Sequence, residues 1–156
     1  MRIIITGGSG FIGTNLIEKL KQSNFEVLNI DVKKPKKTDH IKYWEKADIN
    51  DLSKFKKIVL DFNPDYIVHL AARTDLDGVS LDDYNSNIGG VKNLMKVVNM
   101  VSNLKKIIIT SSMLVCESGY MPKSYKDYKP DTIYGESKVL TEKLVWENSP
   151  NCDWAI

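Results

Sequence analysis

Tyr134 and Lys138 stand four residues apart in a stretch, 133–147, whose pattern predicts a helix, so both side chains would share one helix face. A free tyrosine has a pKa of about 10, and lowering it by roughly three units requires about 4 kcal/mol of preferential phenolate stabilisation. A lysine ammonium one turn away can contribute to that stabilisation. The pair is therefore a candidate general acid/base, although this spacing alone is also typical of a surface pair on a helix.

The hydroxyl run Thr110-Ser111-Ser112 ends an apolar stretch, and Ser112 stands 22 residues before Tyr134. A serine hydroxyl at the end of a strand could align the substrate oxygen whose proton the tyrosine removes. The chemistry then requires a sheet and a helix that bring these groups together.

The residues Thr6 to Gly13 read Thr-Gly-Gly-Ser-Gly-Phe-Ile-Gly and directly follow the apolar run Ile3-Ile4-Ile5. Gly7 can take the positive φ of a tight turn, and Gly10 leaves the backbone bare where a pyrophosphate would approach. Gly13 would let the following helix pack closely on the strand. A strand, a glycine loop and a helix N-terminus together predict a dinucleotide site, with the spacing Gly-x-x-Gly-x-x-Gly.

Asp31 follows the second predicted strand, 18 residues beyond Gly13. A carboxylate there can accept hydrogen bonds from the adenosine ribose hydroxyls and would repel a 2′-phosphate, which favours NAD over NADP. Asp31 could instead cap a turn. Lys33 and Lys34 keep NADP open as the alternative, although the basic run 33–37 is also typical of a solvated loop.

Polar residues follow the next two predicted strands as well. Asp48-Ile49 could contact the adenine amino group, or Asp48 could cap the helix that starts near Asp51. His69 is interpreted as a core histidine rather than a catalyst, and Ala71-Ala72 keep the backbone bare beside a cofactor. Arg73 could bind a substrate phosphate or carboxylate, or lie on the surface.

The whole chain alternates short apolar strands with helical patterns. Strands are predicted over 2–6, 26–30, 41–44, 66–70, 106–110 and 153–156, and helices over 11–22, 52–61, 81–101 and 133–147. The first helix would bury Ile12, Leu16, Ile17 and Leu20 on one face. The alternation predicts one α/β domain over 1–156, a doubly wound parallel sheet (Rossmann fold) with helices on both faces.

Composition narrows the function classes. A net charge of +2 with 42% apolar residues predicts a globular domain without nucleic-acid partners, and no stretch is long enough for a membrane span. Cys116 and Cys152 form no disulfide framework or metal pattern, and His40 and His69 are too isolated for a metal site. A strand that begins at residue 2 leaves no room for a signal peptide, so we expect a cytoplasmic protein without a metal.

Taken together, these residues resemble the extended short-chain dehydrogenase/reductase family, in its NAD-dependent epimerase/dehydratase branch. The matching features, in order and over almost the whole chain, are Thr6 to Gly13, Asp31, Asp48-Ile49, His69-Leu70-Ala71-Ala72, Asn87 with Gly89 before Asn93-Leu94, Thr110-Ser111-Ser112, and Tyr134-x-x-x-Lys138.

The resemblance implies a role for each matching residue. Tyr134 would be the catalytic acid/base, Lys138 would bind the nicotinamide ribose and lower the tyrosine pKa, and Ser112 would orient the substrate. Asn87 would shape the active site from the long helix. The expected NAD-binding residues are Gly7, Gly10, Phe11, Ile12, Gly13, Asp31, Asp48, Ile49, Leu70, Ala71, Ala72, Asn87, Tyr134 and Lys138.

The same resemblance implies a nucleotide-sugar substrate. Met113 and Leu114 occupy the places where similar 4,6-dehydratases carry acidic residues, which favours an epimerase or a simple reductase over a dehydratase. A reductase or dehydratase of the same family and a non-catalytic NAD(P)-binding regulatory protein remain alternatives, and a homodimer is left open. Family members are about twice as long, and Trp154-Ala155-Ile156 stops within a strand pattern, so we expect a fragment truncated before the C-terminal substrate domain.

Overall fold

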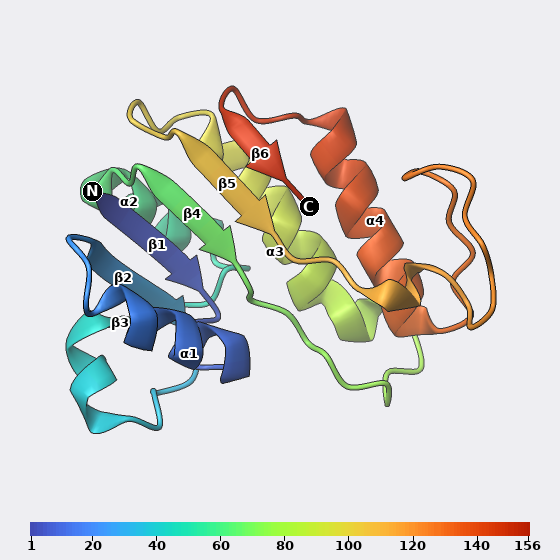
Figure 1. Cartoon of the computed structure of the whole chain (residues 1–156), viewed down its shortest axis with the longest axis horizontal. Helices are drawn as coiled ribbons and strands as arrows, with labels where there is room; N and C mark the ends of the chain where they lie inside the picture. The colour runs from blue at the N-terminus through green and yellow to red at the C-terminus, as the bar shows by residue number, and fades with distance from the viewer.

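A computed structural model describes residues 1–156 and contains one six-stranded parallel sheet of order β3-β2-β1-β4-β5-β6 (Figure 1). The elements are β1 (Arg2–Thr6), α1 (Phe11–Leu20), β2 (Glu26–Asp31), the 3₁₀ helix η1 (Thr38–Tyr43), β3 (Trp44–Lys46), α2 (Leu52–Phe62), β4 (Tyr66–His69), the 3₁₀ helix η2 (Leu81–Tyr84), α3 (Asn85–Val98), β5 (Lys106–Ile109), the 3₁₀ helix η3 (Met113–Val115), α4 (Ile133–Glu147) and β6 (Asp153–Ala155). The predicted doubly wound parallel sheet is confirmed.

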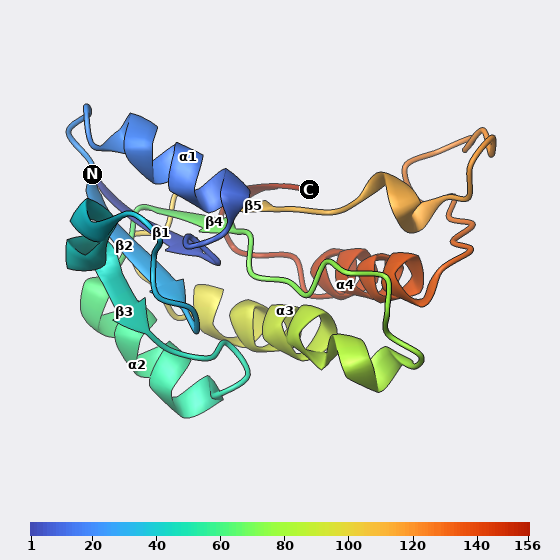
Figure 2. The same cartoon turned by 90° about the horizontal axis from the view of Figure 1, so that it is seen from below.

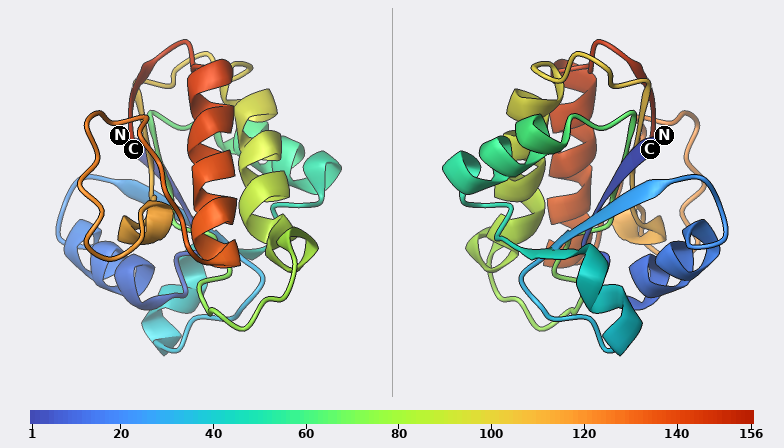
Figure 3. Two further views of the ribbon diagram at one scale, coloured as in Figure 1. Left: turned by 90° about the vertical axis from the view of Figure 1, so that its right-hand side faces the viewer. Right: turned by 90° about the vertical axis from the view of Figure 1, so that its left-hand side faces the viewer.

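Helices lie on both faces of the sheet, but unequally (Figure 2). Helices α2, α3 and α4 cover one face, and α1 covers the other. Side chains along β1 point alternately to the two faces of the sheet. Ile3 and Ile5 pack with Ile17 of α1 on one face, and Ile4 belongs to the larger core on the other face. Helices α3 and α4 lie side by side (Figure 3). None of the helices combines the length and the apolar character needed to cross a bilayer.

The predicted third strand, 41–44, is wrong in its bounds. Ile41 to Tyr43 complete η1, and pairing with β2 begins only at Trp44, which lies opposite Asn29. The indole Nε1 of Trp44 donates to the backbone oxygen of Asp31 at 2.8 Å and so anchors the start of β3. The apolar residues before it therefore precede the strand.

The predicted helix 81–101 is shorter and has a separate first turn. Ser80 and Asp83 form a capping box around η2, and α3 begins at Asn85. The hydroxyl of Tyr84 accepts from Gly78 N at 3.2 Å and donates to Asp75 O at 2.9 Å, so the turn is tied to the preceding loop. Local polar contacts therefore override the helical pattern of this stretch.

His69 is the buried histidine at the end of β4, and its Nδ1 lies 2.7 Å from Thr6 Oγ1. Burial lowers the pKa of His69 to about 3, so the folded protein keeps it neutral at neutral pH. Its interpretation as a core histidine agrees with this placement.

The buried neutral His69 predicts acid sensitivity of the fold. In the unfolded chain this histidine binds a proton below about pH 6.5, whereas in the folded protein it stays neutral down to about pH 3. Its contribution to the free energy of unfolding is therefore complete above pH 6.5 and is lost toward pH 3, by about 1.4 kcal/mol per pH unit. Urea unfolding between pH 6.5 and 5 should show this slope in wild type and in His40→Gln, and should lose it in His69→Gln. An unchanged slope in His69→Gln would contradict the assignment.

Candidate active site

The carboxyl ends of the strands open onto a cleft of about 1140 Å³. Its lining includes Gly7, Gly10, Phe11, Ile12, Gly13, Asp31, Asp48, Ile49, Leu70, Ala71, Ala72, Tyr134 and Lys138. Of the expected NAD-binding residues, Asn87 alone does not line it. Ile12, expected on the buried face of α1, is 60% exposed instead and faces this cleft.

The glycine loop is shaped by close backbone approaches. Gly7 has φ 71°, and a Cβ there would lie 2.6 Å from the backbone nitrogen of Ala71, two residues beyond β4. A Cβ on Gly13 would overlap the backbone of Gly8, so Gly13 packs on the loop itself rather than on the strand. A Cβ on Gly10 would meet only Gly7 O, at 3.3 Å, and would otherwise project into open space.

The start of α1 fits a pyrophosphate. Its N-cap is Gly10, no side chain caps the first turn, and that turn carries no acidic residue. The first-turn N–H groups of an α-helix lack partners within the helix, and the helix dipole adds positive charge there. The bare Gly10 backbone and these donors make a cradle of the kind that binds dinucleotide phosphates.

Gly10→Ala tests this cradle directly. The added methyl group meets no backbone atom closer than 3.3 Å, so the fold should keep its thermal stability. It fills the space where a phosphate would lie, so NAD affinity should fall at least about tenfold. Calorimetric NAD titration of Gly10→Ala beside wild type checks this, and unchanged affinity would place the pyrophosphate elsewhere.

Asp31 both orders the loop and faces the cleft. Its Oδ2 accepts from Ser9 N at 2.9 Å and its Oδ1 accepts from Lys33 N at 2.8 Å. The turn-capping role and the predicted ribose contact therefore share one carboxylate. Lys33 and Lys34 are both exposed, and Lys33 also lines the cleft.

Asp48 also lines the cleft, and another residue caps α2. Asp51 is the N-cap of α2 and accepts from Lys54 N at 3.0 Å. Asp48 accepts from Asn50 N at 2.8 Å within the turn before it. The helix-capping alternative for Asp48 is therefore wrong.

Tyr134 and Lys138 lie in the first two turns of α4, whose predicted bounds are confirmed. Thr132 caps the helix by accepting from Gly135 N at 3.0 Å. Lys138 is buried, its Nζ donates to Thr110 O at 2.9 Å, and burial lowers its pKa. Tyr134 packs against Tyr84, with 5.8 Å between ring centroids. Both side chains reach the cleft from one helix face.

Ser111 and Ser112, which follow β5, have different roles in the structure. Ser112 caps η3, and its Oγ accepts from Leu114 N at 3.1 Å. Ser111 rather than Ser112 lines the cleft, and its hydroxyl donates to Glu142 of α4. The η3 turn packs against α4 at Gly135, where any Cβ would overlap Leu114 O.

Asn87 stands behind the cleft wall instead of on its surface. Its side chain accepts from Arg73 N at 2.7 Å and donates to Arg73 O and to Ser137 Oγ, both at 3.1 Å. It therefore ties the segment after β4 to α4, and any influence on a ligand acts through this positioning.

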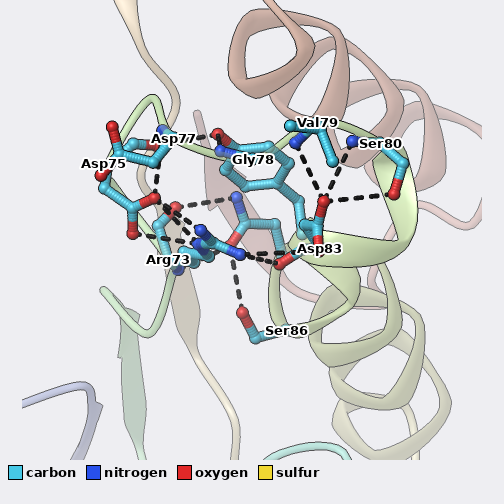
Figure 4. A network of polar contacts seen from close by, with 10 residues as sticks. Arg73, Asp75, Asp77, Gly78, Val79, Ser80, Asp83 and Ser86 are labelled. Atoms are coloured by element: carbon cyan, nitrogen blue, oxygen red, sulfur yellow. Dashed lines mark hydrogen bonds and ion pairs between the residues drawn. The ribbon is translucent and has the colours of Figure 1, made fainter.

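Arg73 lies in a polar network on the segment between β4 and α3 (Figure 4). Its guanidinium binds Asp75 at 2.8 Å, donates to the backbone oxygen of Asp83 at 3.1 Å, and lies over the Tyr84 ring. A partly buried arginine with these partners is held in place by the protein, although it still lines the cleft.

Glu18, Asp39 and His40 bring possible metal ligands within 4.8 Å of one another on α1 and η1. Lys37 binds Glu18 at 2.7 Å, and Lys21 binds both Glu18 and Asp39. The two ammonium groups and His40 lower the pKa of Glu18 to about 2. The cluster is therefore an internally neutralised ion-pair network.

The structure adds two residues that the sequence reasoning missed. Glu142 is buried one turn beyond Lys138, and Tyr84 is fully buried beside Tyr134. Helical spacing could have found Glu142, because it continues the face of Tyr134 and Lys138. No local signal distinguishes Tyr84 from an ordinary core residue.

The parallel sheet, its glycine loop and a Tyr-Lys pair at one cleft define a dinucleotide-binding domain of a short-chain dehydrogenase/reductase type. The model of the NAD dependent epimerase/dehydratase family matches residues 3–154, and the chain belongs to that family.

Individual relatives have several activities. The chain is 33% identical to a probable dTDP-glucose 4,6-dehydratase of Sinorhizobium fredii, over 96% of this chain and 50% of that protein. It is 27% identical to a UDP-glucose 4-epimerase of Lactobacillus helveticus, over 93% of this chain and 46% of that protein. The solved structure of the Bordetella bronchiseptica enzyme WbmG in complex with NAD aligns with TM-score 0.80 and 25% identity, over 99% of this chain and 51% of that one. The chain thus spans about half the length of these relatives.

Proposed function

We propose that this chain carries the NAD site and the catalytic pair of a nucleotide-sugar epimerase. The observation that supports this most is that Tyr134 and Lys138 line the same cleft as the glycine loop. A cradle for a dinucleotide and a proton-transfer group would then serve one reaction. The epimerase among the relatives and the NAD complex of WbmG also support the proposal.

Each residue has a definite task in this proposal. Tyr134 takes the proton of a sugar hydroxyl, and the Lys138 ammonium stabilises the phenolate from one turn away. Ser112, directly after the cleft-lining Ser111, orients the sugar oxygen in this proposal; its oxygen accepts from Leu114 N, which leaves its own hydrogen free to donate. NAD, when bound, supplies the hydride acceptor and can return the hydride to the other face of the sugar.

A dehydratase is the second candidate, favoured by the 33% identity to a probable dTDP-glucose 4,6-dehydratase. Elimination of water needs a further acid and base near the sugar. Met113 and Leu114 stand directly after Ser112, and neither can transfer a proton. This difference favours epimerisation. A purely regulatory protein would not require the Tyr134 and Lys138 arrangement.

The full-length gene product, incubated with NAD and UDP-, GDP- and dTDP-sugars, tests the proposal. Epimerisation gives a sugar isomer with no net NADH, dehydration gives a keto-deoxy product, and reductase chemistry changes the NADH concentration. Separate NAD and NADP titrations test Asp31, since a clear NADP preference would contradict its proposed ribose contact. Light scattering measures whether the protein forms the homodimer left open above.

A further inference from the structure

Glu142 is a buried carboxylate that the catalytic roles above do not use. It lies on α4 one turn beyond Lys138, and the residue is only 9% exposed. Burying a carboxylate is costly unless partners satisfy it, so its environment should show what holds it there.

Two hydroxyl groups from separate segments donate to Glu142. Ser111, just after β5, donates to Oε1, and Tyr128, in the loop before α4, donates to Oε2 at 2.8 Å. Burial, together with this carboxylate, raises the pKa of Tyr128 to about 12, so Tyr128 stays a donor. Two donors and no acceptor suit the ionised carboxylate. Glu142 thereby binds both ends of the segment 111–128 to α4.

Lys138 needs a nearby negative charge. Its ammonium is buried and makes one hydrogen bond, to the carbonyl oxygen of Thr110 at 2.9 Å. The titratable groups around it are Tyr134 and Glu142 on its own helix and the neutral His69 on β4. Asp31 lies on β2, which β1 and β4 separate from β5. Burial lowers the pKa of Lys138, and Glu142 acts in the opposite direction.

We propose that Glu142 is a positioning residue of the active site: it keeps Lys138 in its ammonium form and holds the Ser111–Ser112 segment against α4. The inference deepens the proposed function, because it rests on the use of Lys138 in turnover. It concerns this chain's own charges, however, and can be measured without turnover.

The charge role is tested by titrating Lys138 in ¹⁵N-lysine-labelled protein, with its signal assigned by its loss in Lys138→Arg. In Glu142→Gln the midpoint should fall by about one pH unit, because the compensating charge is gone. Glu147→Gln, the same change at an exposed site on α4, should leave it unmoved. An unchanged midpoint in Glu142→Gln, or an equal fall in Glu147→Gln, overturns the charge role.

The positioning role is tested with Glu142→Asp, which keeps the charge but is too short to reach both Ser111 and Tyr128. This variant also keeps the role testable if Glu142→Gln does not fold. Amide exchange at Thr110, Leu114 and Val115, whose N–H groups donate to His69 O, Ser112 Oγ and Ser112 O, should accelerate at least tenfold, and unchanged exchange overturns this role. If wild type shows no sugar chemistry while Lys138 and these amides respond as expected, the proposed function fails and the inference stands.

Discussion

Replacing Tyr134 by phenylalanine should lower turnover by about 10³-fold while NAD affinity stays within about twofold of wild type. The variant loses one hydroxyl group and keeps the aromatic ring, which packs 5.8 Å from Tyr84 between centroids. The fold and the cradle at Gly10 should therefore survive, and the loss should fall on the proton-transfer step. Single-turnover rates with the full-length gene product, beside calorimetric NAD titrations, separate the two effects.

Tyr125→Phe provides the matched control, because Tyr125 is 73% exposed and does not line the cleft. Its turnover should equal that of wild type. If Tyr134→Phe also retained wild-type turnover, Tyr134 would not be the acid/base. If it lost NAD affinity in proportion to rate, its role would be in binding rather than chemistry.

The glycine loop and the Tyr-Lys helix could be predicted because their signals are local. Positive φ at Gly7 and the helical spacing of Tyr134 and Lys138 depend on neighbours within a few residues. The sheet followed from apolar runs that alternate with helical patterns, so its parallel arrangement was predictable too.

Apart from the local contacts that separate η2 from α3, the errors arose where long-range contacts decide the structure. The strand predicted over 41–44 starts late because Trp44 is anchored to Asp31, and no pattern within the stretch reports that bond. Asn87 was expected to bind NAD and to shape the active site, and the partners that hold its side chain lie 14 and 50 residues away, beyond the reach of any local pattern. The helical pattern also predicted that Ile12 is buried in the core, but Ile12 is exposed and lines the cleft.

The same distinction explains why Glu142 was missed. Its spacing from Lys138 is local, but its burial depends on Ser111 and Tyr128, which come from separate segments. Helical spacing places it on the face of Lys138, but a glutamate in a helix is ordinarily exposed, so the sequence does not predict its burial. Once it is buried beside an ammonium, its charge becomes part of the electrostatics of the site.

Gly135→Ala should strongly destabilise the protein next to the active site. A Cβ at Gly135 would overlap the backbone oxygen of Leu114, which cannot rotate away as a side chain could. Either η3 must move off α4 or the first turn of α4 must open, and we expect a loss of about 2 to 3 kcal/mol. Thermal unfolding should show a midpoint lower by roughly 5 to 10 °C.

Activity should fall further in Gly135→Ala than this loss of stability explains. Ser112 caps η3, so displacing that turn moves the hydroxyl proposed to orient the substrate, and misplacement by about 1 Å can cost 10²-fold. Glu136→Ala, at the exposed neighbouring position, should retain both stability and rate. A Gly135→Ala protein that is fully folded at the assay temperature and turns over at the wild-type rate would show that close packing of η3 on α4 is not what places Ser112.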